Sequence, residues 1–456
     1  MSSPGHRLTR GGYLSYASGA LGTAGFGTVP GLLLSIYLTN TLGVAAGLAA
    51  LVVLFPKLWD LGFLPFVGRL SDRSAARRDT RRPFLLAGAL ILLVTFPFMF
   101  AVPSGLGPYA AAAWVFVAFL VATSAFAFFQ VPYIAMAAEI TDSPRERTTL
   151  MSWRVAFQAA AILAFGVGAP VIRQSVEPLR AGYLVMGIVV AVAIAAGMLV
   201  CWWGIRRTRR YVTAASDQQH VNESLLAQFR LAWKARPFRV LLGAFFIQAL
   251  ATGATITALA YFSLYILGIE DFALLFGVLI VPAVLVMPAW NWFGHRYGKR
   301  AGYLVSSLFF VAGSLLILVA PHVPLWSTVG VIAIAAVGYA GMQMFPLAML
   351  PDTISAEAQE TGTQRAGAFT GVWTAGETAA FALGPAMVLG LLALTGFVSS
   401  TDNTAIQPGS AVVGVLASIS VLPAVLVALS LPLIWKWRLG DSRHSGVSAA
   451  ASTRSR

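Results

Sequence analysis

The chain is a series of apolar segments, each long enough to cross a bilayer as a helix. A hydrocarbon core of about 30 Å needs about 20 apolar residues in a helix, and a backbone in lipid must satisfy its own hydrogen bonds. We therefore expect an all-α membrane protein with twelve transmembrane helices. The expected spans are 13–40, 43–69, 83–103, 109–138, 150–173, 181–204, 238–267, 271–294, 301–320, 325–350, 367–396 and 410–436.

Composition argues against a soluble fold. Hydrophobic residues make up 58% of the 456 residues and charged residues only 11%, with a mean hydropathy of +0.78. A soluble domain carries about 25% charged residues, so this chain lacks the charges to cover a surface in water. Lipid must cover most of it, and the bilayer is its first expected partner.

The formal net charge of +14 comes from 31 Lys and Arg residues, nearly all of which lie in every second gap between the apolar segments. The main clusters are at 69–82, 145–154, 206–239, 296–300 and 436–456. The intervening gaps hold only Arg173 and Arg180. This positive-inside pattern argues against nucleic acid as a partner and predicts cytoplasmic N and C termini. We expect a multi-pass protein of the plasma (inner) membrane.

The two halves of the chain resemble each other weakly. The fourth expected helix ends in Ala135-Met136-Ala137-Ala138-Glu139, and the tenth ends in Ala348-Met349-Leu350-Pro351-Asp352. Gln130 precedes the first copy and Gln343 the second. Two six-helix halves related in this way are typical of a transporter that rocks around a site between its halves.

The predicted organisation has four parts. We expect an N-terminal six-helix bundle at 1–204, a cytoplasmic central loop at 205–237, a C-terminal bundle at 238–437 and a disordered cytoplasmic tail at 438–456. In the central loop, Leu225, Phe229 and Trp233 share a helical face. This spacing favours an amphipathic helix on the membrane surface, and a partly ordered tether is an equal alternative.

Three ionisable residues lie deep in the expected spans, namely Lys57, Asp60 and Glu377. A charge in the bilayer is costly and therefore indicates function. Lys57 and Asp60 are three residues apart on one helical face, so they could also form an ion pair that only fixes helix packing. We assign cation coupling first to Asp60, with Glu377 as a second carboxylate and Lys57 as a possible third member.

Acids and arginines recur at the expected cytoplasmic helix ends of both halves. The gating candidates are Asp72, Arg73, Glu139, Arg145, Arg147, Asp352 and Arg365. Salt bridges among them could close the cytoplasmic side in one state and break in the other. The alternative is that these arginines serve only topology.

Polar and aromatic side chains within the spans form the candidate substrate site. They are Tyr16, Gln130, Tyr133, Arg154, Gln343 and Trp373. Each one alone is more typical of helix packing than of ligand binding. As a set, they predict a cavity with hydrogen-bonding groups and aromatic surfaces.

Several of these motifs resemble one family. Lys57-Leu58-Trp59-Asp60, followed by Pro65, Gly68, Ser71-Asp72-Arg73 and Arg81-Arg82-Pro83-Phe84, resembles the helix two–three signature of the glycoside-pentoside-hexuronide:cation symporters. That family is the melibiose-carrier branch of the major facilitator superfamily. Val131-Pro132-Tyr133 and Arg145-Glu146-Arg147 resemble its helix four–five segment, and Trp373 and Gly384 its helix eleven. The resemblance implies two pseudo-symmetric six-helix bundles and cation-coupled uptake of a sugar or glycoside, with Arg154 near the sugar.

The chain departs from the family pattern at the cation site. The family motif resembles W-D-x-x-N-D-P, whereas this chain has Phe63 and Leu64 in place of the second and third ligands and keeps only Asp60. A single carboxylate suits a proton better than a sodium ion. Ala24 and Gln130 also stand where sugar-carrying members have acidic residues, which weakens the expectation of a sugar without removing it.

We therefore predict a monomeric alternating-access transporter of a small molecule, with no cofactor beyond a coupling ion, H⁺ favoured over Na⁺. The alternative substrate is an amphipathic or apolar molecule, such as a lysolipid or a secondary metabolite, which could be exported. A lipid-linked membrane enzyme ranks low because the acids are dispersed and the loops are short. A channel ranks below a carrier because the chain divides into two halves.

Overall fold

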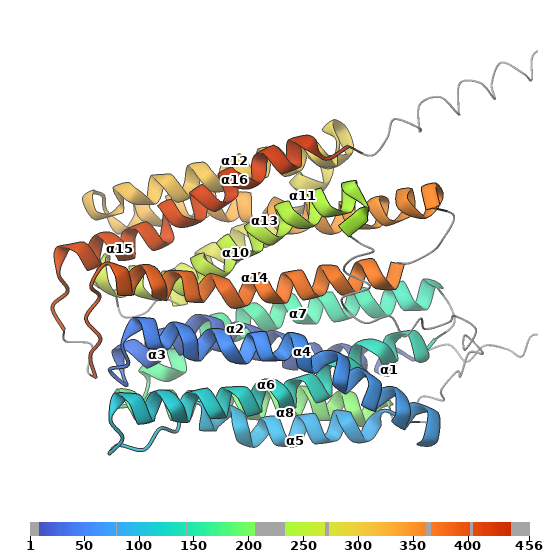
Figure 1. Cartoon of the computed structure of the whole chain (residues 1–456), viewed down its shortest axis with the longest axis horizontal. Coiled ribbons are helices and arrows are strands. Elements are labelled where there is room, and N and C mark those ends of the chain that lie inside the picture. The colour runs from blue at the N-terminus through green and yellow to red at the C-terminus, as the bar shows by residue number, and fades with distance from the viewer. Residues whose placement is uncertain are drawn as a thin grey trace, which may run out of the picture.

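The computed structural model describes residues 9–78, 80–141, 144–205, 233–269, 273–361, 366–401 and 405–438. Within these residues every regular element is a helix, which confirms the all-α part of the expected fold class (Figure 1). The segments at 206–232 and 439–456, which include most of the expected central loop and tail, lie outside the described residues.

The first half of the chain forms one helical bundle. Its elements are α1 (Arg10–Ser18), α2 (Ala20–Val29), η1 (Pro30–Leu34), α3 (Ser35–Asn40), α4 (Ala46–Arg78), α5 (Arg82–Phe98), α6 (Pro108–Glu139), α7 (Pro144–Gln174) and α8 (Leu179–Ile205). α5 packs against α6 and α8, while α4 packs against α6 and α7 against α2. The first four elements follow one another through the bundle as a single crossing, Arg10–Asn40.

The second half repeats this plan. Its elements are α10 (Arg236–Tyr265), α11 (Ala273–Tyr297), α12 (Lys299–Leu316), η3 (Ile317–His322), α13 (Leu325–Thr361), α14 (Ala366–Leu394), α15 (Gly409–Ile419) and α16 (Val421–Lys436). α12 packs against α13 and α16, and α10 packs against α14 and α16. α15 and α16 form one crossing, Gly409–Lys436.

In the described part of the chain, eleven helices are long and apolar enough to cross a membrane. The other expected span, 83–103, is the 17-residue helix α5, which ends at Phe98 just after Pro97. α4 and α13 are longer than expected, since they continue to Arg78 and Thr361. The hydropathy pattern stops where the side chains become polar, whereas the backbone remains helical beyond that point.

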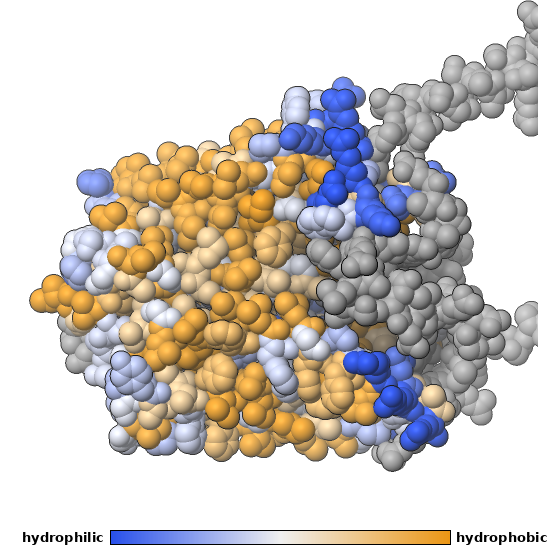
Figure 2. All heavy atoms as spheres, in the orientation of Figure 1, coloured by the Kyte–Doolittle hydropathy of each residue, from blue (hydrophilic) through white to orange (hydrophobic). Residues whose placement is uncertain are grey.

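The molecule has an apolar belt between two more polar ends (Figure 2). At one end lie the start of α1, the junctions between α4 and α5 and between α11 and α12, the start of α10 and the end of α16 (Figure 1). We call this the arginine-rich end, because Arg69–Arg82, Arg236–Arg239 and Arg296–Arg300 lie there. We call the other end the opposite end. It holds the links between α3 and α4, α5 and α6, α7 and α8, α10 and α11, and α14 and α15.

The two bundles meet along three helix pairs. α4 packs against α14, α7 against α11, and η1 and α3 against α10 (Figure 1). Gly166 of α7 lies directly under the ring of Phe276 of α11, where a Cβ atom would collide with it. Asp60 lies on α4 and Glu377 on α14, so both candidate coupling carboxylates are on helices at the boundary.

Glycines allow the closest helix contacts within each bundle. A Cβ at Gly88 of α5 would lie 2.7 Å from the backbone nitrogen of Phe129 of α6. A Cβ at Gly338 of α13 would collide with the backbone of Phe310 of α12. Because apolar surface gives no hydrophobic driving force between helices in lipid, such close packing stabilises the bundle.

Replacing Gly338 by leucine should therefore destabilise the C-terminal bundle. Overpacking against a backbone costs about 1–3 kcal/mol, so we expect a lower thermal unfolding temperature in detergent. Gly330→Leu is the matched control, because it lies on the same helix and a Cβ there meets nothing within 4 Å. Equal unfolding temperatures for the two variants would contradict this packing.

Candidate functional site

Lys57 of α4 is held by aromatic rings instead of by an acid. Its Nζ lies 5.0 Å from the centre of the Phe26 ring and 5.5 Å from that of Phe119. Within the described residues, no ion pair joins Lys57 to Asp60, so the local ion pair that their spacing allowed is not formed. The rings stabilise the ammonium group through their negative faces, which makes its placement in the bundle less costly.

Asp60 is the buried carboxylate of α4. The residue is 7% exposed, and its Oδ1 atom is buried with no hydrogen-bond partner in the described structure. Its neighbour Trp59 points elsewhere, donating from Nε1 to Ser124 Oγ at 3.1 Å. A buried carboxylate oxygen without a donor is costly, so the group is suited to taking up a proton or a cation.

Tyr16 and Tyr133 clamp α1 to α6. Each hydroxyl donates to the other residue's backbone carbonyl, at 3.1 and 3.0 Å, and the two rings stack with their centres 4.7 Å apart. Both side chains are completely buried. The prediction that they bind substrate therefore has no support in this conformation, since their polar atoms already serve helix packing.

Arg154 of α7 lies beside this clamp. Its guanidinium carbon is 5.3 Å from the centre of the Tyr133 ring. Its Nε atom is buried without a hydrogen-bond partner, and no carboxylate of the described residues pairs with it. Arg154 is thus a half-buried cation on the boundary helix α7, and its guanidinium group can still donate a hydrogen bond to a ligand.

Gln130 lies one turn before Tyr133 on α6. Its Oε1 atom accepts a hydrogen bond of 2.7 Å from the Thr23 hydroxyl of α2. Because the amide oxygen faces Thr23, the amide nitrogen of this half-buried side chain points away from Thr23. This orientation is compatible with binding a ligand acceptor.

The C-terminal bundle contributes a second group of candidates. The Trp373 ring of α14 stacks on Phe245 of α10 at 4.2 Å, and its Nε1 is buried without a partner in the described chain. Glu377 follows one turn later on α14 and lies within electrostatic range of Tyr339 of α13. The Tyr339 hydroxyl accepts a hydrogen bond of 3.1 Å from Gln343.

The structure thus forms two groups of candidates, one in each bundle. Tyr133, Tyr16 and Arg154 are in contact in the first, while Gln343 and Tyr339 are hydrogen-bonded in the second. No described hydrogen bond or ion pair joins the two groups. In the described residues, no cluster of three His, Cys, Asp or Glu side chains could hold a metal ion.

At the arginine-rich end, Asp72 pairs within its own bundle. Its carboxylate accepts from Arg81 at 2.6 Å, and the same guanidinium donates to Ser71 at 2.8 Å. We expected Asp72 to form salt bridges between helices with nearby arginines such as Arg73. Its described partner is Arg81, which directly precedes α5.

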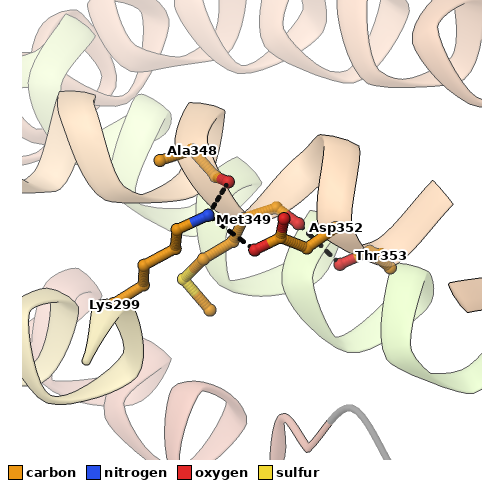
Figure 3. Close-up of polar contacts among 5 residues, drawn as sticks. All are labelled: Lys299, Ala348, Met349, Asp352 and Thr353. Carbon is orange, nitrogen blue, oxygen red and sulfur yellow. Dashed lines mark hydrogen bonds and ion pairs between the residues drawn. The ribbon is translucent and has the colours of Figure 1, made fainter. Parts of the chain in front are cut away.

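Asp352 pairs in the same way in the second bundle. Figure 3 shows Lys299, at the start of α12, donating to Asp352 at 2.6 Å and to the Ala348 carbonyl at 2.9 Å. The partner is thus a lysine and not one of the arginines that we expected. Both described ion pairs fasten helices within a bundle, so neither closes the arginine-rich end across the boundary.

The other gating candidates receive no structural answer. The side chains of Glu139, Arg145 and Arg147 and the whole of Arg365 lie outside what the structure describes. Arg73 is exposed at the surface of α4.

At the opposite end, polar side chains join the two bundles directly. The Thr39 hydroxyl lies 2.8 Å from that of Tyr261, and Asn40 Nδ2 donates to the Tyr265 hydroxyl at 2.5 Å. Thr39 also donates to Asn40 Oδ1 at 2.7 Å, which leaves Tyr261 as the donor to Thr39. We call these four residues the tyrosine latch.

Neighbouring groups hold the latch in place. The Thr39 carbonyl accepts a backbone hydrogen bond of 2.9 Å from Ser400, in the link after α14. Arg180 donates to the Thr41 carbonyl at 3.3 Å. Phe397 presents its ring edge-on to both latch tyrosines. Arg180, which departs from the positive-inside pattern, therefore supports the end of the first crossing.

Sequence reasoning missed the tyrosine latch because it searched for gates among charged residues. The available signals were two tyrosines four residues apart in the seventh expected span and, separately, a Thr-Asn pair at the end of the first span. That spacing places both hydroxyls on one helical face. Nothing in the sequence alone says that α3 and α10 meet.

Comparison with known proteins gives a consistent picture. The family model described as "MFS/sugar transport protein" matches residues 15–441. The "Glucuronide carrier protein homolog" of Escherichia coli (strain K12) is 25% identical, with 91% of this chain and 90% of that protein covered. The "Putative glycoside/cation symporter YagG" of the same organism is 24% identical, with 91% of this chain and 89% of that protein covered.

More distant relatives differ in substrate. The "Sodium-dependent lysophosphatidylcholine symporter 1-A" of Danio rerio is 21% identical, with 92% of this chain and 84% of that protein covered. A solved structure of a bacterial homologue of the human lysosomal transporter Spinster, inward-facing and unoccupied, has a TM-score of 0.67. It is 14% identical and covers 94% of this chain and 98% of its own, so the likeness concerns the fold alone.

Removing the latch hydroxyls should loosen the opposite end. In the double variant Tyr261→Phe/Tyr265→Phe the rings remain against Phe397, while two hydrogen bonds of about 1 kcal/mol each are lost. We expect the ratio of open to closed molecules at this end to rise about thirtyfold. The measurement is the distance between spin labels at Ser175 and Ile406, both exposed, in a Cys201→Ser background.

Tyr303→Phe provides the control for that experiment. It makes the same change in the same bundle, at a buried hydroxyl that has no hydrogen-bond partner in the described structure. The label distances should then match those of the unmodified protein. If the double variant also left the distances unchanged, the latch would not hold the bundles together.

Proposed function

This chain belongs to the MFS/sugar transport protein family, in its glycoside-pentoside-hexuronide:cation symporter branch, and we propose that it carries a glycoside across the membrane by alternating access, coupled to protons. It is a multi-pass membrane transporter and not an enzyme. The proposal rests first on the family match over residues 15–441. The buried Asp60 on a boundary helix supports the coupling to protons.

The proposed topology follows from the distribution of charge. We place the arginine-rich end in the cytoplasm, in keeping with the positive-inside rule, and count α5 as the twelfth crossing. With twelve crossings both termini are cytoplasmic, and an inner-membrane location fits. A single chain supplies both candidate groups, so a monomer is the proposed transport unit. Residues 205–237 and 438–456 remain assigned as central loop and tail.

The proposed state of the structure is inward-facing. The tyrosine latch ties the bundles together at the opposite end, whereas the two described ion pairs at the arginine-rich end lie within single bundles. Transport would then require the latch to open and the cytoplasmic ends to approach each other. Glu139, Arg145, Arg147 and Arg365 are the remaining candidates for that inner gate.

The proposed coupling group is Asp60, with a proton as the coupling ion. Phe63 and Leu64 supply no oxygen ligands, and a sodium ion usually binds several. The unpartnered Oδ1 atom of Asp60 is in keeping with a carboxyl that takes up and releases a proton. Glu377 is the second candidate, since it lies on the facing helix α14.

The proposed substrate is an acidic glycoside. Arg154 is a half-buried cation without a carboxylate partner among the described residues. Gln130 of α6 offers an amide and Trp373 of α14 an indole N–H. A hexuronide carboxylate could accept hydrogen bonds from the guanidinium group. The glucuronide carrier homologue among the relatives agrees with this choice.

A lysolipid is the second candidate substrate. It rests on the relatives in Danio rerio that are named as lysophosphatidylcholine symporters. Such a substrate would need a sideways opening to the bilayer. Trp59 and Phe66 of α4, each about half exposed, provide apolar surface on a boundary helix where such an opening could form.

A matched pair of ligands tests the substrate proposal. We expect p-nitrophenyl β-D-glucuronide to raise the unfolding temperature of the purified protein, because a ligand at about 100 times its Kd stabilises by ~2.7 kcal/mol. The corresponding glucoside should act more weakly, and sodium should change neither result.

Arg154→Gln should weaken binding of the glucuronide about tenfold and leave binding of the glucoside unchanged. Stabilisation by lysophosphatidylcholine alone would favour the second candidate.

Asp60→Asn tests the coupling role. In proteoliposomes we expect the variant to lose accumulation driven by a pH gradient and to keep exchange of substrate across the membrane, because the site would stay permanently uncharged. Glu177→Gln makes the same chemical change at an exposed residue of the opposite end and should accumulate normally. Gradient-driven accumulation at the unmodified level in Asp60→Asn, together with its loss in Glu377→Gln, would transfer the role to Glu377.

A further inference from the structure

Three helix ends of the second bundle meet at one corner of the arginine-rich end. α16 packs against both α10 and α12, which brings the end of α16 beside their starts. The cations of this corner, which we call the basic corner, are Lys234, Arg236, Arg239, Arg300, Lys436 and Arg438. Asp352, the acid next to the start of α12, is already paired with Lys299.

Two of these arginines are held in position by exposed tryptophans. Arg300 donates to the Trp435 carbonyl, and its guanidinium carbon lies 4.9 Å from the centre of the Trp435 ring. Arg239 donates to the Trp233 carbonyl at 3.2 Å and lies 5.9 Å from that ring. Trp435 is 63% exposed and Trp233 47%.

The same corner holds buried donors that lack an acceptor. Arg300 Nε and Trp437 Nε1 are both buried, and neither has a hydrogen-bond partner within the described structure. Trp437 lies between Lys436 and Arg438, which are both exposed. Donors without acceptors among several cations are suited to an anion with several oxygen atoms.

The location of the corner indicates where this anion comes from. Figure 2 shows hydrophilic side chains directly bordering the apolar belt at this end of the molecule. Tryptophan prefers the headgroup level of a bilayer, where its ring meets lipid and its N–H meets polar groups. A phosphate bound here would therefore sit at the depth of a phospholipid headgroup.

We propose that the basic corner is a binding site for the phosphodiester headgroup of an anionic phospholipid. Arg239 and Arg300 bind the phosphate oxygens, and Lys436 and Arg438 add attraction at the membrane surface. The cluster repels the ammonium group of a zwitterionic lipid, so the site selects lipids with a net negative charge. Charges that serve topology alone need no fixed geometry, whereas these two arginines are each fixed by a ring and a carbonyl.

Binding of individual lipids to the full-length protein tests this site. We would measure it by native mass spectrometry in detergent, with phosphatidylglycerol and phosphatidylcholine of identical acyl chains. We expect Arg239→Gln/Arg300→Gln to bind phosphatidylglycerol about thirtyfold more weakly and phosphatidylcholine unchanged. Arg77→Gln/Arg82→Gln is the control, since it removes two charges at the same end of the first bundle, where Arg82 stacks on Trp202 at 5.1 Å. Equal losses in the two double variants would overturn the proposal.

A second double variant keeps both positive charges but removes the planar guanidinium groups. Arg239→Lys/Arg300→Lys should bind phosphatidylglycerol clearly more weakly than the unmodified protein, because lysine lacks the planar group that stacks and donates at once. If binding were unchanged, the corner would attract lipids only through its net charge, and the proposal of a specific headgroup site would be wrong. Inorganic phosphate and glycerol 3-phosphate should not compete with the lipid, and competition by either would assign the corner to a free phosphate. None of these outcomes depends on transport of a glycoside.

Discussion

The cost of placing a charge in hydrocarbon organises this protein. Most cations of the described residues lie at the arginine-rich end, and Lys57 and Arg154, which lie within the spans, are stabilised by aromatic rings. Lys57 lies over Phe26 and Phe119, and Arg154 over Tyr133. Asp60 keeps one buried oxygen without a donor in the described structure, and Arg154 keeps one buried nitrogen without an acceptor. These uncompensated polar atoms lie on α4 and α7, two of the helices between the bundles.

Sequence reasoning predicted the fold well because its signals are local. Apolar length and the placement of arginines are properties of single segments, and they located each crossing to within a few residues, apart from the ends of α4, α5 and α13. The motifs at 57–60, 71–73, 81–84, 131–133 and 145–147 similarly indicated the family, since each is a short local stretch. The similar helix ends of the two halves predicted two six-helix bundles.

The candidate site was harder to predict because its contacts join distant segments. Hydropathy cannot distinguish a tyrosine that binds a ligand from one that clamps two helices, so Tyr16 and Tyr133 were grouped with Gln130 and Arg154. Spacing suggested an ion pair for Lys57, yet two rings from other helices compete for its ammonium group. Asp72 and Asp352 likewise pair with the start of a neighbouring helix, which no local pattern specifies.

The chemistry of the tyrosine latch has a consequence for the energetics of the cycle. Its members are hydroxyl and amide groups, so the described hydrogen bonds between the bundles at this end involve no formal charge. When the latch opens, no side-chain charge needs to move through the electric field of the membrane. The membrane potential and the ionic strength would then act on the transport cycle at the coupling carboxylate and at the inner gate, and leave the release of the opposite end to hydrogen bonding and water.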